Sequence, residues 1–275
     1  MTLIAAFSTQ NCPVLFGDLL LTGEATQNNK RNIAVPALGN VGDFFGNSDW
    51  AITGLAQKVV LISPSCAIAW AGSWIGAKSL IFDLREMSQR EALTAGAILS
   101  YLEQNTDLQQ YPVSVVGWVL EGRENFKQFW YEAEYTFTGD KLGLVAVAGT
   151  GRSAMKQFVE TIGSMPPIAT TGTVGPAQLA IGTSSFLNSA LIRTELHGGN
   201  STPTLLSMFG GGYEAAIYTD GAFRKIGDIT YVLWEACVIK GKVIFSSPQL
   251  ILKQQYESPR VSWRPVGLSQ ATMAA

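Results

Sequence analysis

The sequence predicts an α+β domain in which antiparallel strands dominate, and three observations indicate this class. Two short apolar runs at the chain start, residues 3–7 and 14–17, flank a polar turn at residues 8–13, which is a hairpin pattern. Apolar residues recur at helical spacing in two separate stretches, residues 73–105 and 177–195. Strand patterns occupy much of the remaining chain, without the regular strand and helix alternation of a parallel sheet.

The other elements follow from the same two periodicities. The stretch at residues 73–105 predicts two helices with a break near residues 87–89. A shorter helix is predicted at residues 152–160, and the helix at 177–195 is closed by Gly198 and Gly199. The strand patterns at 113–120, 126–134 and 141–148 predict a meander made of a hairpin and a third strand. Further strands are predicted at 57–62, 66–72, 205–209, 213–219, 229–239 and 242–245.

Two segments fit neither periodicity. Residues 22–56 are polar and rich in glycine but contain several aromatic residues, and they fit no strand pattern well, so we interpret them as an insertion. Their aromatic side chains could cover an active-site cleft, shape a substrate pocket, contact a neighbouring subunit or pack on the core of the domain itself. Residues 246–275 contain three prolines and have no strong period, which predicts a C-terminal extension to a single domain at residues 2–245.

Composition excludes several classes of function. The 275 residues are 47% hydrophobic, which suits a sizeable buried core, and a formal net charge of −2 offers no basic surface for nucleic acid. Cys12, Cys66 and Cys237 lack metal-ligand spacing, and His197, the single histidine, is expected at the surface or at a helix cap. We therefore expect no metal and no cofactor. Without a signal-peptide pattern or a run of eighteen apolar residues, we expect a cytoplasmic protein with reduced thiols and no membrane contact.

The first residues carry the chemistry. The small side chain of Thr2 permits removal of Met1, so the mature chain could begin with a threonine that carries both a hydroxyl group and a free α-amine. A nucleophile and a base would then share one residue. The predicted hairpin returns the chain to its start and brings back the carboxylate of Asp18. Further along, Lys58 opens an otherwise apolar strand, and the next strand ends on Gly72.

These residues resemble a known family. The order and spacing of four motifs are similar to those of the proteasome β-subunit family, which includes the bacterial relative HslV and belongs to the N-terminal-nucleophile (Ntn) hydrolases. The motifs are Gly17 with Asp18, the run 58–62 that starts with Lys58, the turn 71–76 that contains Gly72, and the turn 149–151 that contains Thr150. The resemblance covers about residues 2–240 apart from the insertion. It implies a four-layer αββα sandwich, in which two antiparallel sheets lie between helical layers.

The resemblance also implies roles for the motif residues. Thr2 would be the nucleophile and its α-amine the base, while the Lys58 ammonium would lower the pKa of that amine by repulsion between like charges. Asp18 would keep Lys58 charged and oriented. The backbone N–H of Gly72 would stabilise the oxyanion, and Thr150 resembles a family serine that forms a hydrogen bond near the amine.

One family position is ambiguous in this sequence. The family has a second aspartate near the nucleophile, at the end of the helix predicted here at residues 177–195. Alignment of the glycines that follow leaves Thr194 or Glu195 at that position, and the sequence does not decide between them.

The expected function is that of a threonine peptidase or amide hydrolase, acting on a peptide or another amide within a homo-oligomeric ring, with an ATPase or regulatory partner left open. Two alternatives share the fold: a catalytically silent structural subunit that retains Met1, and an amidase for small molecules. The turn at residues 149–154 also satisfies a loose dinucleotide-binding pattern. No acidic residue follows it at the distance that a ribose contact requires, so we reject that interpretation.

Overall fold

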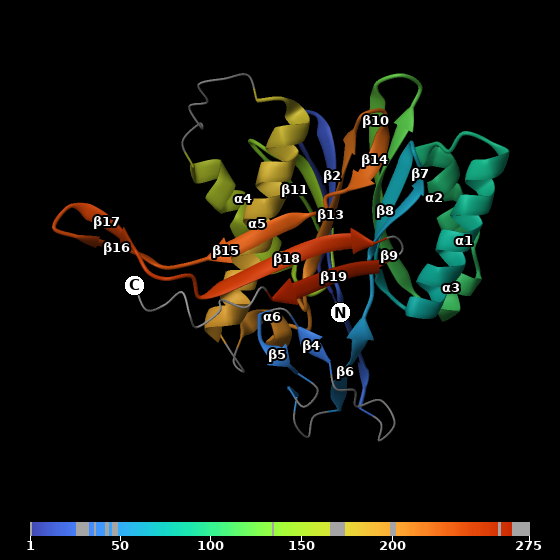
Figure 1. The fold of residues 1–275 in the computed structure, drawn as a ribbon. Coiled ribbons are helices and arrows are strands. Elements are labelled where there is room, and N and C mark those ends of the chain that lie inside the picture. The colour runs from blue at the N-terminus through green and yellow to red at the C-terminus, as the bar shows by residue number, and fades with distance from the viewer. Residues whose placement is uncertain are drawn as a thin grey trace.

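Two antiparallel sheets form the centre of the molecule. The structure is a computed structural model that describes residues 2–25, 33–35, 37–41, 44–45, 49–133, 135–165, 174–198, 202–257 and 260–265. It is a mixed α and β fold, and all of its strand pairs are antiparallel (Figure 1).

The larger sheet has six strands and holds the chain start in its middle. Its order is β11 (Tyr135–Gly139), β12 (Gly143–Ala148), β1 (Ile4–Thr9), β2 (Cys12–Asp18), β13 (Tyr213–Thr219) and β14 (Ala222–Lys225). Helices α4 (Arg152–Ser164) and α5 (Pro176–Gly198) contribute to the hydrophobic core on one face of this sheet. Because side chains alternate along a strand, Leu3, Ala5 and Phe7 face these helices while Ile4 and Ala6 face the other way.

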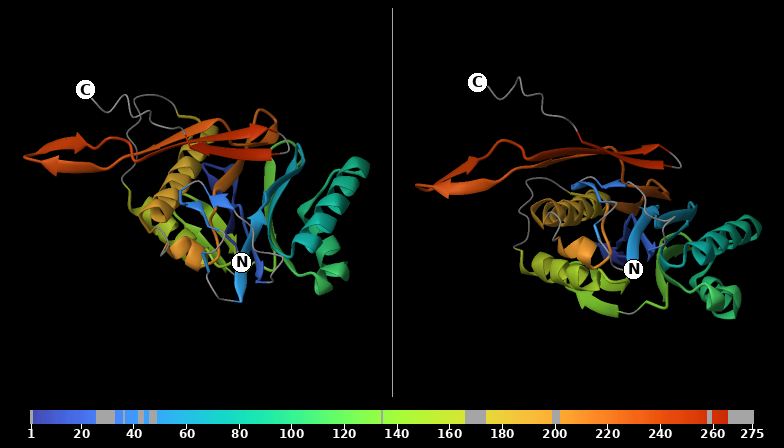
Figure 2. Two further views of the ribbon diagram at one scale, coloured as in Figure 1. Left: turned by 60° about the horizontal axis from the view of Figure 1, so that its bottom comes forward. Right: turned by 90° about the horizontal axis from the view of Figure 1, so that it is seen from below.

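The smaller sheet has four strands and packs against the free face of the first. Its order is β10 (Asn125–Tyr131), β9 (Val113–Glu121), β8 (Cys66–Gly72) and β7 (Val59–Ser63). A core cluster that includes Ile4 and Leu15 from the six-stranded sheet and Ala69 and Trp118 from this sheet lies between the two. On the far side of the smaller sheet, α1 (Trp74–Arg90) and α2 (Ala95–Gln104) supply a separate core, with the short α3 (Asp107–Gln110) next to them (Figure 2).

The predicted meander does not exist as one sheet. Strands β9 and β10 form the expected hairpin, but β12 crosses to the larger sheet and pairs with β1, with Ile4 opposite Ala148. The helical break also differs from the prediction, because α1 continues through residues 87–89 and ends at Arg90. Strands β11 and β14, which were not predicted, occupy the two edges of the larger sheet.

Two predicted strands near the C-terminus are wrong or divided. Residues 205–209 were predicted as a strand, but a short helix, α6 (Pro203–Leu206), begins at a proline in its first turn, where proline is favoured because no N–H partner is needed. The long strand predicted at 229–239 is divided into β15 (Ile229–Leu233) and β16 (Ala236–Ile239). Strand β16 pairs only with β17 (Lys242–Phe245), in a hairpin that projects from the body (Figure 2).

The segment at residues 22–56 is more regular than predicted. Its two ends pair as β3 (Leu20–Glu24) and β6 (Trp50–Leu55), a two-stranded ribbon, and β4 (Ala34–Val35) pairs with β5 (Gly39–Asn40). Phe44 and Phe45 pack against a small core of their own, which includes Leu20 and Ile52. These two aromatic side chains therefore pack on their own domain, which is one of the roles considered for the segment.

The C-terminal segment also contains strands. Strand β18 (Leu250–Glu257) pairs with β15 and with β19 (Arg260–Pro265), and Leu252 is fully buried in the core beside α5. The predicted C-terminal extension therefore contains strands although its sequence has no strong period, and residues 266–275 lie outside the described ones. Within the described residues, no helix is both long and apolar enough to cross a membrane.

Candidate active site

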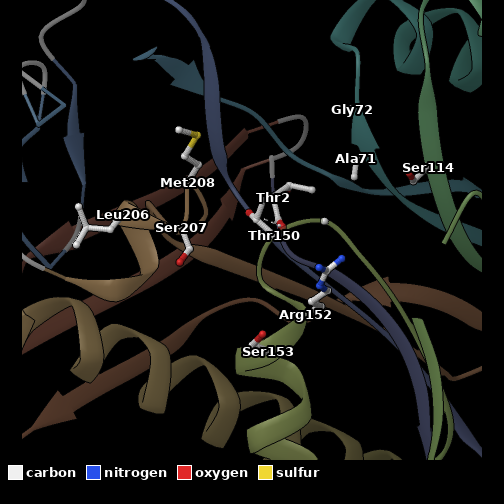
Figure 3. Close-up of a pocket in the computed structure, with 11 residues that line it drawn as sticks. Thr2, Ala71, Gly72, Ser114, Thr150, Arg152, Ser153, Leu206, Ser207 and Met208 are labelled. Carbon is white, nitrogen blue, oxygen red and sulfur yellow. Dashed lines mark hydrogen bonds between the residues drawn. The ribbon is translucent and has the colours of Figure 1, made fainter. Parts of the chain in front are cut away.

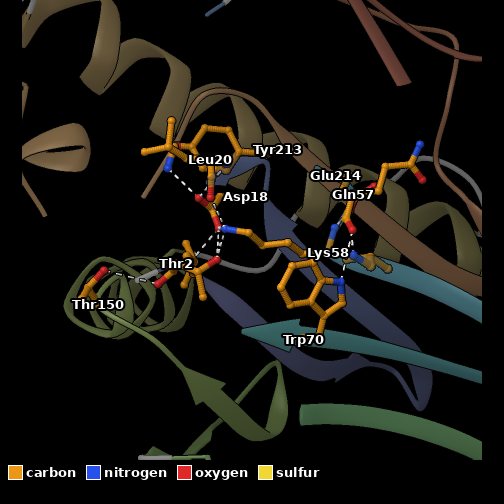
Figure 4. A network of polar contacts seen from close by, with 12 residues as sticks. Thr2, Asp18, Leu20, Gln57, Lys58, Trp70, Thr150, Tyr213 and Glu214 are labelled. Atoms are coloured by element: carbon orange, nitrogen blue, oxygen red, sulfur yellow. Dashed lines mark hydrogen bonds and ion pairs between the residues drawn. The ribbon is translucent and has the colours of Figure 1, made fainter. Parts of the chain in front are cut away.

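The side chains of Thr2, Asp18 and Lys58 meet at one end of the larger sheet (Figure 4). The Thr2 hydroxyl donates a hydrogen bond to Asp18 Oδ1 and accepts one from Lys58 Nζ. Lys58 Nζ lies 2.7 Å from Asp18 Oδ1, which makes an ion pair. All three residues are at most 1% exposed. The structure therefore brings together three of the residues that the sequence analysis singled out.

The hairpin of β1 and β2 places Asp18 beside the chain start. Its register sets Ile4 opposite Gly17, so Asp18 falls next to Leu3, whose N–H donates to Asp18 Oδ1 at 2.9 Å. Glycine at position 17 leaves room for the side chain next to Lys58, because a β-carbon there would lie 3.2 Å from a Val59 methyl carbon, whereas it would be in ordinary contact with Lys58 Cβ at 3.5 Å. The short distance between Thr2 and Asp18 is thus a product of local hairpin geometry.

Backbone groups complete the polar environment of the ion pair. Asp18 Oδ2 accepts hydrogen bonds from the N–H groups of Gly210, at 2.8 Å, and Leu20, at 3.2 Å. Lys58 Nζ also donates to the carbonyl oxygen of Leu20 at 2.6 Å. Burial lowers the pKa of Lys58, and the Asp18 carboxylate opposes this shift. Sequence reasoning missed Leu20 and Gly210, since both act through backbone atoms that any residue type carries.

The turn at residues 149–151 holds the backbone of Thr2. The Gly151 N–H donates to the Thr2 carbonyl oxygen at 3.0 Å, and the Thr150 hydroxyl reaches the same oxygen at 3.5 Å. Gly149 has φ +91°, and a β-carbon at this position would lie 2.2 Å from that oxygen. Only glycine fits there. Thr150 therefore forms its hydrogen bond with the carbonyl group of Thr2, whereas the resemblance implied a bond near the α-amine.

A pocket of about 620 Å³ opens beside Thr2 (Figure 3). Hydroxyl groups and a few apolar side chains line much of it, and Arg152 is the one charged residue among those that line it. Met208 lines it with φ +60°, a conformation that is uncommon for residues other than glycine and that recurs at functional sites. The lining residues are Thr2, Ala71, Gly72, Ser114, Gly149, Thr150, Arg152, Ser153, Leu206, Ser207 and Met208.

Gly72 lies at this pocket at the end of β8. It has φ +100°, and a β-carbon would lie 2.5 Å from the Pro112 carbonyl oxygen, so the position requires glycine. The N–H of Trp70 bonds to the Lys58 carbonyl oxygen, on the β7 side of β8. Because N–H directions alternate along a strand, the N–H of Gly72 points to that same side, beyond the first residue of β7.

The structure distinguishes between Thr194 and Glu195. Thr194 is exposed, and its hydroxyl bonds back to the Ala190 carbonyl oxygen of its own helix. Glu195 is fully buried and accepts a hydrogen bond from the Tyr213 hydroxyl at 2.7 Å. Tyr213 pairs with Asp18 in the sheet, so Glu195 lies behind the Asp18 side of the site. Burial raises the pKa of Glu195 to about 7.

A second buried carboxylate near Lys58 was not predicted. Glu214 is fully buried and accepts hydrogen bonds from the backbone N–H groups of Lys58, at 2.5 Å, and Val59, at 2.7 Å. Its only signal in the sequence is a single acidic residue within an apolar strand.

The remaining titratable candidates lie elsewhere. His197 is exposed in the last turn of α5, where a cap or surface position was expected. Cys12 and Cys66 are buried and Cys237 is exposed, and all three are free thiols. No cluster of side chains suited to bind a metal ion occurs among the described residues.

No protein-family model matches the sequence, and no curated protein matches it at a significant level.

Proposed function

We propose that this protein is a threonine-type N-terminal-nucleophile hydrolase that cleaves an amide bond with Thr2. One observation carries the proposal: the Thr2 hydroxyl lies between the Lys58 ammonium and the Asp18 carboxylate, at the edge of a pocket. A lone threonine hydroxyl is a poor nucleophile, and a buried ion pair in contact with it supplies the charge and the positioning that such a nucleophile needs.

The packing order supports the same family at the level of fold. Three hydrophobic cores separate four successive layers. In order, the layers are helices α4 and α5, the larger sheet, the smaller sheet, and helices α1 and α2. We therefore include the αββα sandwich of the Ntn hydrolases in the proposal. The strands at residues 229–265 add two smaller sheets outside this order, one made of β15, β18 and β19 and the other of β16 and β17.

The reaction begins once Met1 is removed and the α-amine of Thr2 is free. Thr2 Oγ1 attacks the carbonyl carbon of the substrate amide, and the hydroxyl proton passes to the α-amine. The C–N bond then breaks, the leaving amine takes that proton, and an ester on Thr2 remains. Water hydrolyses the ester, with the α-amine accepting a proton from the water and returning it to Oγ1.

The neighbouring groups have separate tasks in this scheme. The Lys58 ammonium disfavours a second positive charge nearby, which keeps the α-amine neutral and able to accept a proton. It also stabilises negative charge on Thr2 Oγ1. Asp18 holds the ammonium in place, and the N–H of Gly72 is the donor that we assign to the oxyanion.

The pocket and the exposed surface indicate the kind of substrate and assembly. A volume of about 620 Å³ accommodates a peptide side chain with its flanking backbone or a small amide. The hairpin of β16 and β17 exposes Val238, Val243 and Phe245 by 59–70%, which supports assembly with further copies of the chain. The free thiols of Cys12, Cys66 and Cys237 suit a reducing compartment such as the cytoplasm.

Hydrolysis assays on a peptide-amide library test the proposal. We expect the protein with a free Thr2 to cleave members of the library, Thr2→Ser to retain part of the rate, and Thr2→Ala to lose it while its circular dichroism spectrum is unchanged. Activity that persists in Thr2→Ala would refute Thr2 as the nucleophile. A protein that retains Met1 and cleaves nothing would instead be the silent subunit.

A further inference from the structure

Lys58 is held at both of its ends by different carboxylates (Figure 4). Asp18 binds the ammonium, as described above, while Glu214 Oε1 accepts the backbone N–H groups of Lys58 and Val59. Strand alternation directs neighbouring residues of β13 to opposite faces, so Tyr213 reaches Glu195 and Glu214 reaches the start of β7. The backbone of Lys58 therefore depends on a side chain from another strand.

The second oxygen of Glu214 connects this carboxylate to two more strands. Lys225 on β14 forms an ion pair with Glu214 Oε2, and the Tyr256 hydroxyl on β18 donates to the same oxygen at 2.6 Å. The Lys225 ammonium also lies 5.2 Å from the centre of the Tyr256 ring. Burial lowers the pKa of Lys225 and raises that of Tyr256. The carboxylate thus has four donors, two of them on the elements that follow β13.

We propose that Glu214, Lys225 and Tyr256, which we call the Glu214 cluster, position Lys58 for its task at Thr2. The C-terminal strand β18 then belongs to the support of the active site and is more than a cover for the core. This inference rests on the proposed function, because it assigns the cluster to the reaction in which Lys58 takes part. The three members are positioning residues, since in the described structure their polar atoms contact Lys58 only through its backbone.

The strand geometry explains why Lys58 needs this support. Lys58 lies immediately before β7, so its N–H and that of Val59 bind a carboxylate instead of a carbonyl group of a neighbouring strand. A shift of Glu214 would move the Lys58 backbone, and the Nζ atom would lose its alignment with Thr2. Catalytic contacts tolerate little displacement, and an error of about 1 Å can cost on the order of 100-fold in rate.

Charge couples the cluster to Lys58 as well. The charged groups that act on the Lys58 ammonium are Asp18 from β2 and Glu214 from β13, and both oppose the lowering of its pKa by burial. Lys225 and Tyr256 contact the far oxygen of Glu214, and the ammonium contacts the hydroxyl of Thr2, the residue that carries the α-amine once Met1 is removed. Loss of the Glu214 charge is therefore expected to lower the pKa of Lys58 further.

Three variants test the cluster in the full chain, and the first of them, Glu214→Gln, removes only the carboxylate charge. Tyr256→Phe removes one hydroxyl group and keeps the ring beside Lys225. The double variant Glu214→Gln with Lys225→Met removes both charges together, so that neither is left buried without its partner. Tyr231→Phe is the matched control, because Tyr231 is a buried tyrosine on the adjacent β15 whose hydroxyl bonds to Asn188 and Gln254.

The first measurement follows the titration of Lys58 by NMR of protein labelled with ¹⁵N-lysine, with Lys58→Arg to assign the signal. We expect Lys58 in Glu214→Gln to titrate about one pH unit below the wild type, a tenfold change in the acid dissociation constant. In the double variant, loss of the Lys225 ammonium offsets part of this shift, so its Lys58 should titrate between the two. We expect Lys58 in Tyr231→Phe to titrate at the same pH as in the wild type. An unchanged Lys58 titration in Glu214→Gln would overturn the inference.

The second measurement follows covalent modification of Thr2 by a β-lactone. We expect Tyr256→Phe to lower the maximal rate of modification about tenfold with little change in the reagent concentration at half-maximal rate, because alignment is lost and binding is kept. Tyr231→Phe should react like the wild type. Equal rates for Tyr256→Phe and wild type would contradict the inference. If Lys58 responds in the NMR titration but wild-type Thr2 does not react, the proposed function fails and the support of Lys58 by the cluster stands.

Discussion

The ammonium of Lys58 lies 2.7 Å from the carboxylate of Asp18, and their side chains are 2% and 0% exposed. A pair at this depth is weak evidence for stability in itself, because removing two charges from water costs several kcal/mol per ion. The ion pair also has an unusual third partner, because both the carboxylate and the ammonium form hydrogen bonds with the Thr2 hydroxyl.

Asp18→Ala should destabilise the protein strongly at neutral pH. The substitution leaves the Lys58 ammonium buried without a counter-charge, which typically costs about 3–5 kcal/mol. Urea unfolding measures the loss, which should be smaller at pH 9 because burial lowers the pKa of Lys58 and a neutral amine needs no counter-charge. The control is Glu86→Ala, which breaks the exposed ion pair with Arg90 and should cost less than about 1 kcal/mol. Equal losses for the two variants would contradict the burial of the pair.

Gly149→Ala should damage the site more than Gly122→Ala. Both glycines have positive φ, +91° and +81°, so alanine is strained at either position by about 1–2 kcal/mol. Only at Gly149 would the new β-carbon also meet an atom, the Thr2 carbonyl oxygen at 2.2 Å, whereas the space around Gly122 is open. Unfolding and hydrolysis assays on the two variants separate strain from displacement of Thr2. If Gly149→Ala behaved like Gly122→Ala in both assays, the close contact with Thr2 would be wrong.

Glu195 should make the stability of the protein depend on pH. Its pKa is about 7 in the folded protein against 4.5 for an ordinary glutamate, so the folded state favours the protonated form. The stability that this provides is present below pH 4.5 and is lost as the pH rises through 7. The free energy of unfolding of the wild type should equal that of Glu195→Gln near pH 4 and be lower by about 3 kcal/mol at pH 8. If wild type and Glu195→Gln differed in stability by the same amount at pH 4 and pH 8, the prediction would be wrong.

One of the three thiols should react in the native protein. Cys237 is exposed on the projecting hairpin, whereas burial raises the pKa of Cys12 and raises that of Cys66 to about 12. Because the thiolate is the reactive form, a chromogenic disulfide reagent at pH 8 should modify one thiol per chain quickly. Cys237→Ser should remove this reaction until urea is added. Rapid modification of two or three thiols in the folded wild type would contradict the burial of Cys12 and Cys66.

Local patterns predicted the four strands of the smaller sheet and the four longest helices, whereas the strands at residues 20–55, 135–139, 222–225 and 250–265 and the pairing of β12 were missed. The hairpin that joins Thr2 and Asp18 was accessible because it is a local structure with a clear turn. The placement of β12 in the larger sheet was not, since a strand pattern does not specify its partner. At α6, an apolar run resembled a strand, although Pro203 in the first turn favours a helix.

The site shows the same division between local and distant information. Thr194 and Glu195 point about 100° apart on a helix, so only the packing of α5 on the sheet could decide which one is buried. The partners of Glu214 lie 11 and 42 residues further along the chain, and no spacing rule relates them. The contacts of Leu20 and Gly210 with Asp18 use backbone N–H groups, which no sequence pattern reveals.

The most direct test is the intact mass of the untagged protein before and after treatment with a β-lactone, followed by mapping of the modified peptide. We predict a mass that lacks one methionine and then increases by one reagent molecule, attached to Thr2 in the N-terminal peptide. A chain that keeps Met1 and takes up no reagent would contradict the claim that Thr2 is the nucleophile.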